Sequence, residues 1–392
     1  MSSTICVKCK GRLLCGRLKC PLVEKFKFLS KIEIGKVIND QTPPSIFIGR
    51  IGYPKISVGP LIAFNVDPIY ADSPWLWENI EEVIRLRVSL VRTSRKLKVE
   101  SPRNPCRFTQ NIQELAGSTR PIDVEVRVNK IIKRSQFDDT FQPIGPTAFI
   151  DKMAITENPK IPNKVEEYYY DDAKSNEALF DLYGHGYSTY YLQRLFSAGM
   201  IGRIKNRKFV PTRWSITAVH SIIGEKLKEQ IKEYDILDKY MLFTNEYFGN
   251  KFFILFIPAS YSFYLVEIWR RGSVWSPNKD QICFDYESHW KKNDYSELGG
   301  GYYAARLPIL EYQAKIKKQA LVFMIREIKP LYFAPLGVWV VEEGVKMALK
   351  SKPETFNSLE EVIKSIGKEV DSRVIGYIQK INTQRNLSQF FD

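Results

Sequence analysis

The sequence has no hydrophobic run long enough to cross a membrane. No uninterrupted apolar stretch exceeds six residues, the length of the run at 252–257, whereas a membrane-spanning helix needs roughly 18. The first 36 residues contain nine Lys and Arg, so the start of the chain does not have the apolar core of a secretory signal. We therefore expect a soluble, cytoplasmic protein with no membrane partner.

The sequence also lacks the patterns of common enzymes. It has no P-loop, no H-E-x-x-H, no G-x-S-x-G and no dinucleotide-binding glycine fingerprint after a clear strand. Its three histidines, His185, His220 and His289, are too widely separated to indicate a triad or a metal cage. Spacing alone therefore indicates no particular catalysis, and the question of enzyme activity stays open at this point.

Acidic residues are in the minority, since 44 Asp and Glu face 58 Lys and Arg for a net charge of +14. An excess of this size favours a polyanionic partner, most often nucleic acid, although it can also serve solubility. Lys and Arg contact phosphates whatever the base sequence is. We therefore expect sequence-independent DNA binding and association with the nucleoid. The candidate DNA-binding residues are Lys8, Lys10, Arg12, Arg85, Arg87, Arg92, Arg95, Arg207, Lys208 and Arg213.

Four of the six cysteines fall within the first 20 residues. Cys6, Cys9, Cys15 and Cys20 have the spacing C-x2-C-x5-C-x4-C, and a C-x2-C pair is the usual first half of a tetrahedral zinc site. The segment has little else from which to build a core, so metal binding would supply its folding energy. Residues 1–36 contain nine basic and two acidic residues. Part of this positive charge would balance the negative charge of the thiolates, and the rest could contact phosphates. We expect a basic module that holds a structural zinc ion.

Two disulfides or an iron–sulfur cluster are the alternatives for these cysteines. A reducing cytoplasm disfavours disulfides, and the spacing matches neither common ferredoxin pattern. Elemental analysis distinguishes zinc from iron.

The last nine residues carry apolar side chains in a compact pattern. Gln384 is followed by Leu387 and then by Phe390 and Phe391. In one helical or 3₁₀ turn the leucine projects beside the two aromatic rings, and the glutamine can hydrogen-bond at their edge. Apolar anchors at a terminus suit the groove of a partner protein, although a last helix could instead pack them on its own domain. The pattern resembles the motif that binds the PCNA sliding clamp.

Strands and helices are mixed without a regular βαβ rhythm, which favours an α+β fold with helices and mostly antiparallel strands. Strict alternation of apolar and polar residues predicts a strand at 122–128. Further strands are predicted within 37–70, at 251–257 and 262–269 as a hairpin, and at 320–325. Helices are predicted at 75–92, 188–198, 215–234, 302–318, 338–349 and 359–381.

Two glycine-framed aromatic segments could line a pocket, one around the histidine at 183–191 and the other at 299–306. Glycines allow close approach of the backbone, and the free N–H groups at a helix start suit an anion. A glycine-rich turn with tyrosines packed below it explains the same residues without any function. The candidate pocket residues are His185, Tyr187, Tyr190, Trp214, Tyr302, Tyr303 and Arg306.

The cysteine cluster, the tail and five segments of the body together resemble the archaeal Nre DNA-repair family, in its NreA branch. The five segments are IGRIGYPKISVGP at 48–60, YGHGYSTYYLQRLF at 183–196, VPTRWSITA at 210–218, GGYYAAR at 300–306 and PLGVW at 335–339. The resemblance covers almost the full length of the chain.

The resemblance implies a factor that acts in DNA-damage repair through the sliding clamp, alongside nucleotide-excision repair proteins. It implies four parts: a zinc module at 1–36, an N-terminal family half at 37–235, a C-terminal half at 236–383 and a clamp-binding tail at 384–392. Two alternatives stay open. One is a nucleotide- or DNA-modifying enzyme whose pocket combines the two glycine-framed segments, and the other is a non-enzymatic scaffold between the clamp and excision-repair proteins.

Overall fold

A computed structural model describes most of the chain. The described residues are 9, 11–14, 16, 18–29, 35–132, 145–276, 278–290, 292 and 294–388, without the side chains at 21, 22, 26, 29 and 382–388. Among the helices in these ranges, none is both long enough and apolar enough to cross a membrane.

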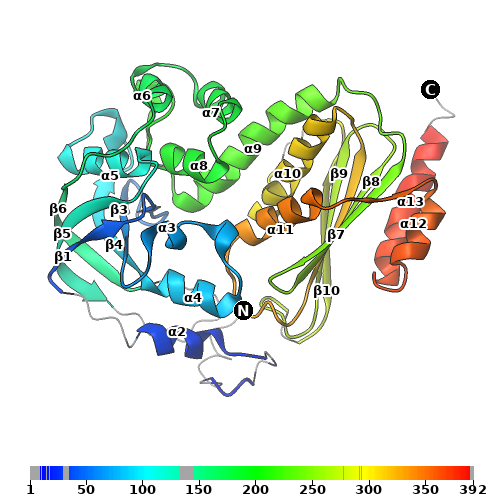
Figure 1. Cartoon of the computed structure of the whole chain (residues 1–392), viewed down its shortest axis with the longest axis horizontal. Helices are drawn as coiled ribbons and strands as arrows, with labels where there is room; N and C mark the ends of the chain where they lie inside the picture. The colour runs from blue at the N-terminus through cyan, green and yellow to red at the C-terminus, as the bar shows by residue number, and fades with distance from the viewer. Residues whose placement is uncertain are drawn as a thin grey trace. The chain divides into compact units, whose positions relative to one another are not determined.

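The chain forms two compact units (Figure 1). Unit 1 comprises residues 1–226 and 332–339, and unit 2 comprises residues 227–331 and 340–392. The boundary falls inside the long helix α9 (Thr212–Ile231). The division into four parts at residues 36, 235 and 383 stays a prediction.

Unit 1 is built on a six-stranded sheet with the order β1-β5-β6-β4-β3-β2. The strands are β1 (Val37–Thr42), β2 (Ile46–Ile48), β3 (Lys55–Ala63), β4 (Leu90–Lys98), β5 (Ile122–Ile132) and β6 (Thr147–Ile155). Neighbours are antiparallel except β4 and β6, which are parallel. The alternation predicted at 122–128 is confirmed, because the apolar side chains at the start of β5 are buried and the polar ones exposed.

Short helices complete unit 1 around this sheet. They are α2 (Pro21–Leu29), α3 (Pro68–Ala71), α4 (Ile80–Ser89), α5 (Arg107–Gly117), α6 (Asn163–Tyr170), α7 (Ser175–Gly184) and α8 (Thr189–Ser197), with 3₁₀ turns η1 (Pro74–Leu76), η2 (Ser101–Arg103) and η3 (Ile204–Asn206). The single helix predicted at 75–92 is wrong in extent. A new helix starts after Asn79, whose side chain accepts a hydrogen bond from Glu82 N at 2.8 Å, and strand β4 already begins at Leu90 because it pairs with β3.

Unit 2 contains a second six-stranded sheet with the order β10-β9-β11-β8-β7-β12. Its strands are β7 (Tyr240–Tyr247), β8 (Asn250–Ile257), β9 (Ser262–Trp269), β10 (Gln281–Glu287), β11 (Leu321–Ile328) and β12 (Glu354–Phe356). In Figure 1, α12 (Leu359–Ile366) and α13 (Ser372–Ser388) lie on one side of this sheet, while α10 (Gly300–Ile316) and α11 (Trp339–Lys350) lie on the other. A core of apolar residues fills the space under α12 and α13.

The hairpin predicted from 251–257 and 262–269 is wrong, although both strands form. Strand β11 lies between them, antiparallel to β8 and parallel to β9. Seven of the eight residues of β8 are buried, as in a central strand that has a neighbour on each side. The chain reaches β11 through the crossover helix α10, which is what a parallel pair requires.

The α+β class is confirmed, and the expectation of mostly antiparallel strands is corrected to two mixed sheets. Each sheet contains one parallel pair, β4 with β6 and β9 with β11. The chain returns to the sheet through a helix between the two members of each pair, α5 in unit 1 and α10 in unit 2. The N-terminal zinc knuckle stays a prediction.

Candidate nucleic-acid interface

Three basic segments of unit 1 lie side by side. Strands β3 and β4 are antiparallel neighbours. The end of β4 is joined to the segment before α9, because Phe209 N donates to Val99 O at 2.8 Å. The end of β2 is joined to α9 itself, because Ile48 N donates to Thr212 Oγ1 at 3.0 Å. The β2–β3 loop, the end of β4 and the start of α9 therefore form one continuous surface.

These segments carry almost only positive charge. Residues 46–60 contain two Lys or Arg, residues 90–100 contain four and residues 203–214 contain five, against the single acidic residue Glu100. Six of their exposed cations, none of which forms an ion pair with a described residue, are called the cationic surface here. They are Arg50, Lys55, Lys96, Lys98, Lys208 and Arg213.

The strand register brings like charges together on this surface. Lys55 lies directly opposite Lys98 across the β3–β4 pair, and Lys96 lies opposite Ser57. A side chain at position 52 would come within 3.4 Å of Lys96 Nζ, so this ammonium lies beside the β2–β3 loop. Like charges directly opposite one another lower stability. The stability of the fold therefore does not account for this arrangement of charge.

Other arginines of the predicted DNA-binding set have partners within unit 1. Arg207 is buried and donates to the carbonyl oxygens of Gly202, Tyr168 and Asp171 at 2.8–3.3 Å. Burial lowers the pKa of this guanidinium, and its donors join the segment at 202–207 to the end of α6. Its position indicates a structural contribution.

Four more arginines from the stretch at 85–95 pack on neighbouring side chains. Arg87 lies 4.9 Å from the ring of Trp77 and Arg92 lies 4.0 Å from the ring of Phe47. The other two contacts are Arg95 over Phe108 at 5.5 Å and Arg85 to Glu82 at 3.9 Å.

Trp214 lies on the first turn of α9, beside the cationic surface. Half of its side chain is exposed, and its ring stacks on that of Tyr53 with a centroid distance of 6.1 Å and an interplanar angle of 25°. Sequence reasoning missed Tyr53. Its available signal was its position between Gly52 and Pro54, in a loop whose only charges are positive.

At the N-terminus, two of the four clustered cysteines are described. Cys9 is buried, and its sulfur accepts a hydrogen bond from Leu14 N at 3.2 Å. Its carbonyl accepts from the backbone and side chain of Arg12 at 2.9 and 3.2 Å. An N–H bond to sulfur stabilises a thiolate, the form that binds zinc.

The rest of this segment is joined to α4. Cys20 directly precedes α2 and is partly buried, and Lys19 forms an ion pair with Glu81 on α4. Four of the predicted residues here lie outside the described residues: Cys6, Lys8, Lys10 and Cys15.

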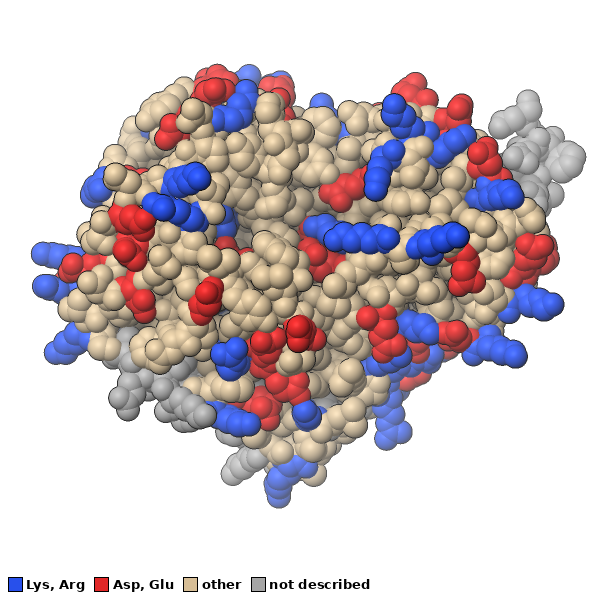
Figure 2. All heavy atoms as spheres, in the orientation of Figure 1, with Lys and Arg blue, Asp and Glu red and all other residues tan. Residues whose placement is uncertain are grey.

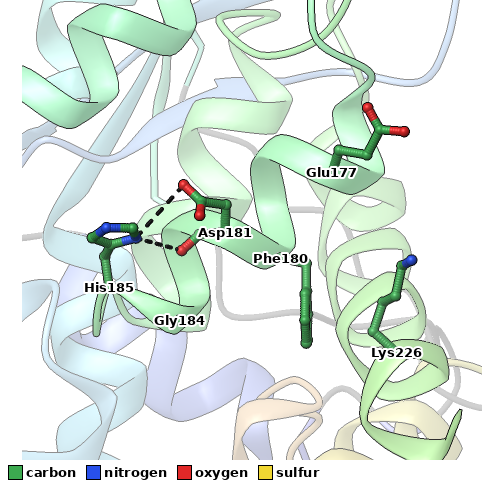
Figure 3. Close-up of a pocket in the computed structure, with 6 residues that line it drawn as sticks. All are labelled: Glu177, Phe180, Asp181, Gly184, His185 and Lys226. Carbon is green, nitrogen blue, oxygen red and sulfur yellow. Dashed lines mark hydrogen bonds and ion pairs between the residues drawn. The ribbon is translucent and has the colours of Figure 1, made fainter. Parts of the chain in front are cut away.

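A cavity of about 530 Å³ opens between α7 and α9 in unit 1 (Figure 3). Its lining residues are Glu177, Phe180, Asp181, Gly184, His185 and Lys226. A side chain at position 184 would meet no atom within 4 Å, so the backbone is open to the cavity there.

His185 is oriented by Asp181, one turn earlier on α7. Its Nδ1 lies 2.8 Å from the carbonyl oxygen and 3.6 Å from a carboxylate oxygen of Asp181. The same carboxylate accepts a hydrogen bond from Tyr168 at 2.8 Å. Burial and this bond raise the pKa of Tyr168 to about 12, so its hydroxyl is a donor at neutral pH. An oriented imidazole in a cavity has the geometry that acid–base chemistry uses, and His185 N also caps the end of α7.

The tyrosines that follow His185 pack on other aromatic residues. Tyr187 lies 5.6 Å from Tyr191, and Tyr190 lies 5.6 Å from Trp75, measured between ring centroids. Both pairs belong to unit 1 and support the start of α8.

The second glycine-framed segment belongs to the interior of unit 2. Arg306 is 1% exposed and donates to Glu287 Oε2 at 2.7 Å, while Tyr261 donates to Glu287 Oε1 at 2.6 Å. Lys228 Nζ lies 3.7 Å from the same carboxylate. These four residues are called the Glu287 cluster. Burial raises the pKa of Tyr261 well above its ordinary value.

Tyr302 and Tyr303 are buried beside this cluster. Tyr303 Oη accepts a hydrogen bond from Ser296 N at 3.2 Å. The two glycine-framed segments thus belong to different units, and the second one contributes buried side chains to its own unit.

The predicted tail starts inside α13, a helix whose earlier residues belong to the core of unit 2. Val374 and Ile378 are buried in that core. The backbone at Gln384 and Leu387 is helical and forms part of α13. Phe390 and Phe391 lie outside the described residues.

Charges of both signs share the face of the protein drawn in Figure 2. Lys and Arg side chains are scattered among Asp and Glu there. The excess positive charge of +14 is therefore not spread evenly over the surface. The three basic segments, which contain only one acidic residue, differ in this respect from the face drawn in Figure 2.

Comparison with known proteins defines the class of protein. Residues 14–276 match the family described as Archaeal Nre, N-terminal, and residues 287–390 match Archaeal Nre, C-terminal. The chain belongs to the archaeal Nre family.

Relatives narrow this assignment to the NreA branch. The chain is 54% identical to DNA repair protein NreA of Archaeoglobus fulgidus over the full length of both proteins. It is 33% identical to DNA repair protein NreB of the same organism, over 98% of this chain and 99% of the relative. It is 32% identical to DNA repair protein NreA of Haloferax volcanii, over 80% of this chain and 79% of the relative. No solved structure matches the chain significantly.

Proposed function

We propose that this protein is a DNA-repair factor that binds DNA through the cationic surface and is tethered to the PCNA sliding clamp by its C-terminal tail. The names of its relatives support the repair role. The observation that carries DNA binding is the group of six exposed cations that form no ion pair with a described residue. Their targets are phosphates, which are the same along any DNA.

Tethering makes weak DNA contacts sufficient. A partner held by a short flexible segment experiences an effective concentration in the millimolar range, so a modest phosphate affinity gives high occupancy at the clamp. The tail is suited to this because α13 contributes to the core through Val374 and Ile378, and the motif starts later, at Gln384. Nucleotide-excision repair proteins are further partners implied by the family.

DNA binding is tested by measuring affinity for labelled DNA against salt concentration. Each phosphate contact contributes about 0.9 to the logarithmic salt slope on a duplex. Replacing Lys55, Lys96 and Lys98 together by Ala should lower affinity about 10- to 100-fold and reduce the slope by about 2–3.

A matched control makes the same change in net charge on unit 2. Lys350, Lys352 and Lys368 are exposed, and their joint replacement by Ala should leave DNA affinity within about twofold. Affinity that does not depend on salt, or an equal loss in both triple variants, would contradict a specific cationic surface.

Clamp binding is tested with the double variant Phe390→Ala and Phe391→Ala. We expect it to abolish binding to an archaeal PCNA in calorimetry and to change the free energy of unfolding by less than about 0.5 kcal/mol. Phe284, which is 54% exposed on β10, provides the control, because Phe284→Ala also removes an exposed aromatic ring and should keep clamp binding. A large loss of stability in the tail variant would mean that the tail packs on its own domain.

We also propose that Cys6, Cys9, Cys15 and Cys20 hold one structural zinc ion. The buried Cys9 thiol and its N–H bond from Leu14 support this assignment. Elemental analysis should find one zinc per chain, and iron instead would indicate the cluster alternative. Chelation should disorder about the first 20 residues and leave the main unfolding transition in place. Loss of the main transition would mean that the module is integral to unit 1.

The scaffold alternative is one outcome of these tests. A folded protein that binds the clamp but binds neither duplex nor single-stranded DNA at low salt would link the clamp to other repair proteins without touching DNA itself.

A further inference from the structure

Two large aromatic side chains, those of Tyr53 and Trp214, are exposed beside the cationic surface. Tyr53 is 47% exposed and Trp214 is 50% exposed, and the two rings stack. Aromatic side chains usually contribute their large apolar area to the core. About half of the ring area of this stacked pair is therefore not buried in the core and can contact a ligand.

The backbone holds Tyr53 in a closed loop. Gly49 N donates to Ser57 O, and Lys55 N donates to Gly52 O, both at 2.8 Å. Gly52 has φ +95°, and a Cβ there would lie 2.8 Å from Lys55 O, so only glycine fits this turn. Val99 N donates to the carbonyl oxygen of Pro54, the residue after Tyr53, at 2.8 Å. This bond joins the loop to the end of β4.

The backbone position of Trp214 is also fixed by hydrogen bonds. It lies on the first turn of α9, where its N–H donates to Pro211 O at 2.7 Å. Thr212, two residues earlier, accepts from Ile48 N and so joins the helix start to the strand that enters the loop. The aromatic pair is therefore fixed before any ligand arrives, which lowers the entropic cost of binding.

The surrounding charge indicates what covers the pair. The ammonium of Lys96 lies beside position 52, Lys55 and Lys98 lie on the adjoining strands, and Arg213 precedes the tryptophan in sequence. Apolar ring area surrounded by cations complements a strand of alternating bases and phosphates. A protein partner would need an unusually acidic surface here.

We propose that Tyr53 and Trp214 form a base-stacking site, so that the protein prefers single-stranded or unpaired DNA to intact duplex. The faces of paired bases are hidden inside a duplex, whereas an unpaired base offers its π-face to an aromatic ring. This inference rests on the proposed DNA binding and adds the class of DNA structure that the cationic surface selects.

The test compares a 20-nucleotide thymidine strand with a duplex of equal length, by fluorescence anisotropy. Trp214→Ala should lower affinity for the single strand about 10-fold and change duplex affinity by less than about twofold. Trp214→Phe should keep most of the single-strand affinity, because it retains a ring. Tyr53→Ala should act in the same direction as Trp214→Ala.

Salt dependence separates stacking from charge. The salt slope should be unchanged in Trp214→Ala, since stacking releases no counterions, and reduced when Lys55, Lys96 and Lys98 are replaced. Tryptophan fluorescence gives a second measurement: the single strand should quench the wild-type protein more strongly than Trp214→Phe.

The possible failures are distinguishable. If the wild-type protein binds no DNA of either kind, the proposed function itself is wrong. If it binds both DNAs equally, and Trp214→Ala and Tyr53→Ala match the wild type while remaining folded, DNA binding stands and the stacking site is wrong. That second result would leave a protein partner as the occupant of the exposed pair.

Discussion

Two groups of positively charged side chains in this protein have opposite surroundings. In the cationic surface of unit 1, lysines such as Lys55 and Lys98 are exposed and form no ion pair with a described residue. In the Glu287 cluster of unit 2, Lys228 and Arg306 are 0% and 1% exposed and share one carboxylate. Burial and the presence of a carboxylate therefore distinguish the two groups, rather than residue type.

Desolvation explains why the two groups have different uses. A charge removed from water must be compensated by a nearby opposite charge and by hydrogen bonds. The cations around Glu287 meet this requirement and so belong to the fold. An exposed cation costs the fold little, and its interactions remain available to a ligand. The comparison predicts that variants of the Glu287 cluster change stability and that variants of the cationic surface change DNA affinity.

The largest effect is expected from Glu287→Ala. This substitution leaves two buried cations without their shared carboxylate and Tyr261 without its acceptor. We expect the free energy of unfolding to fall by about 3–5 kcal/mol in urea denaturation. DNA affinity of the fraction that remains folded should not change.

An exposed ion pair in the same unit gives the matched control. Glu229 is 2.9 Å from Lys232 and its side chain is 65% exposed, so Glu229→Ala should cost less than about 0.5 kcal/mol. Equal losses in the two variants would show that burial does not decide the contribution of a charge in this protein, and the comparison would be wrong.

A smaller effect is expected at Asp371. Its side chain is 13% exposed and pairs with the largely exposed Arg373, so this ion pair is less buried than those of the Glu287 cluster. The Asp371 carboxylate accepts from the backbone and the guanidinium of Arg373 at the start of α13 and lies 3.8 Å from Arg270. These contacts lower the pKa of Asp371 to about 2. Because the folded pKa is below the ordinary value, the stabilisation is present above about pH 4 and disappears as pH falls through about 2.

The matching variant is Asp371→Asn. At pH 7 we expect it to lower the free energy of unfolding by about 1 kcal/mol, because Arg373 is largely exposed and salt screens the pair. Urea titrations at pH 7, 4 and 3 should show the difference from wild type narrowing at the lowest pH. A difference that stays constant with pH would mean that the charge of Asp371 contributes nothing and that only its shape matters.

The fold was predictable from sequence where one periodicity dominates. The alternation at 122–128 identified β5, and the helix predicted at 188–198 forms as α8. Pairing was not predictable, because β8 and β9 are adjacent in sequence and mostly apolar, and such runs do not reveal which strand lies beside them. Strand β11, about 50 residues later, takes that place.

The candidate site shows the same limit for side chains. Counting charges located the basic stretches but ranked Arg92 and Arg207 with Lys208, although the first two pack on partners inside unit 1. Exposure depends on the strand register and on contacts between distant segments. Tyr53 and Trp214 meet although they are far apart in sequence, and no local pattern specifies that contact.

A small expected gain in stability gives the sharpest test of the comparison. Lys98 lies directly opposite Lys55, so Lys98→Glu replaces a repulsive cross-strand pair by an attractive one. We expect the free energy of unfolding to rise by about 0.5 kcal/mol while DNA affinity falls about 10-fold. Lys98→Gln, which removes the charge without adding an opposite one, should lie between the two proteins in both measurements. If Lys98→Glu lowered both the free energy of unfolding and the DNA affinity, Lys98 would belong with the structural cations around Glu287. Reversing the charge of a cation lowers stability only where the fold depends on that cation.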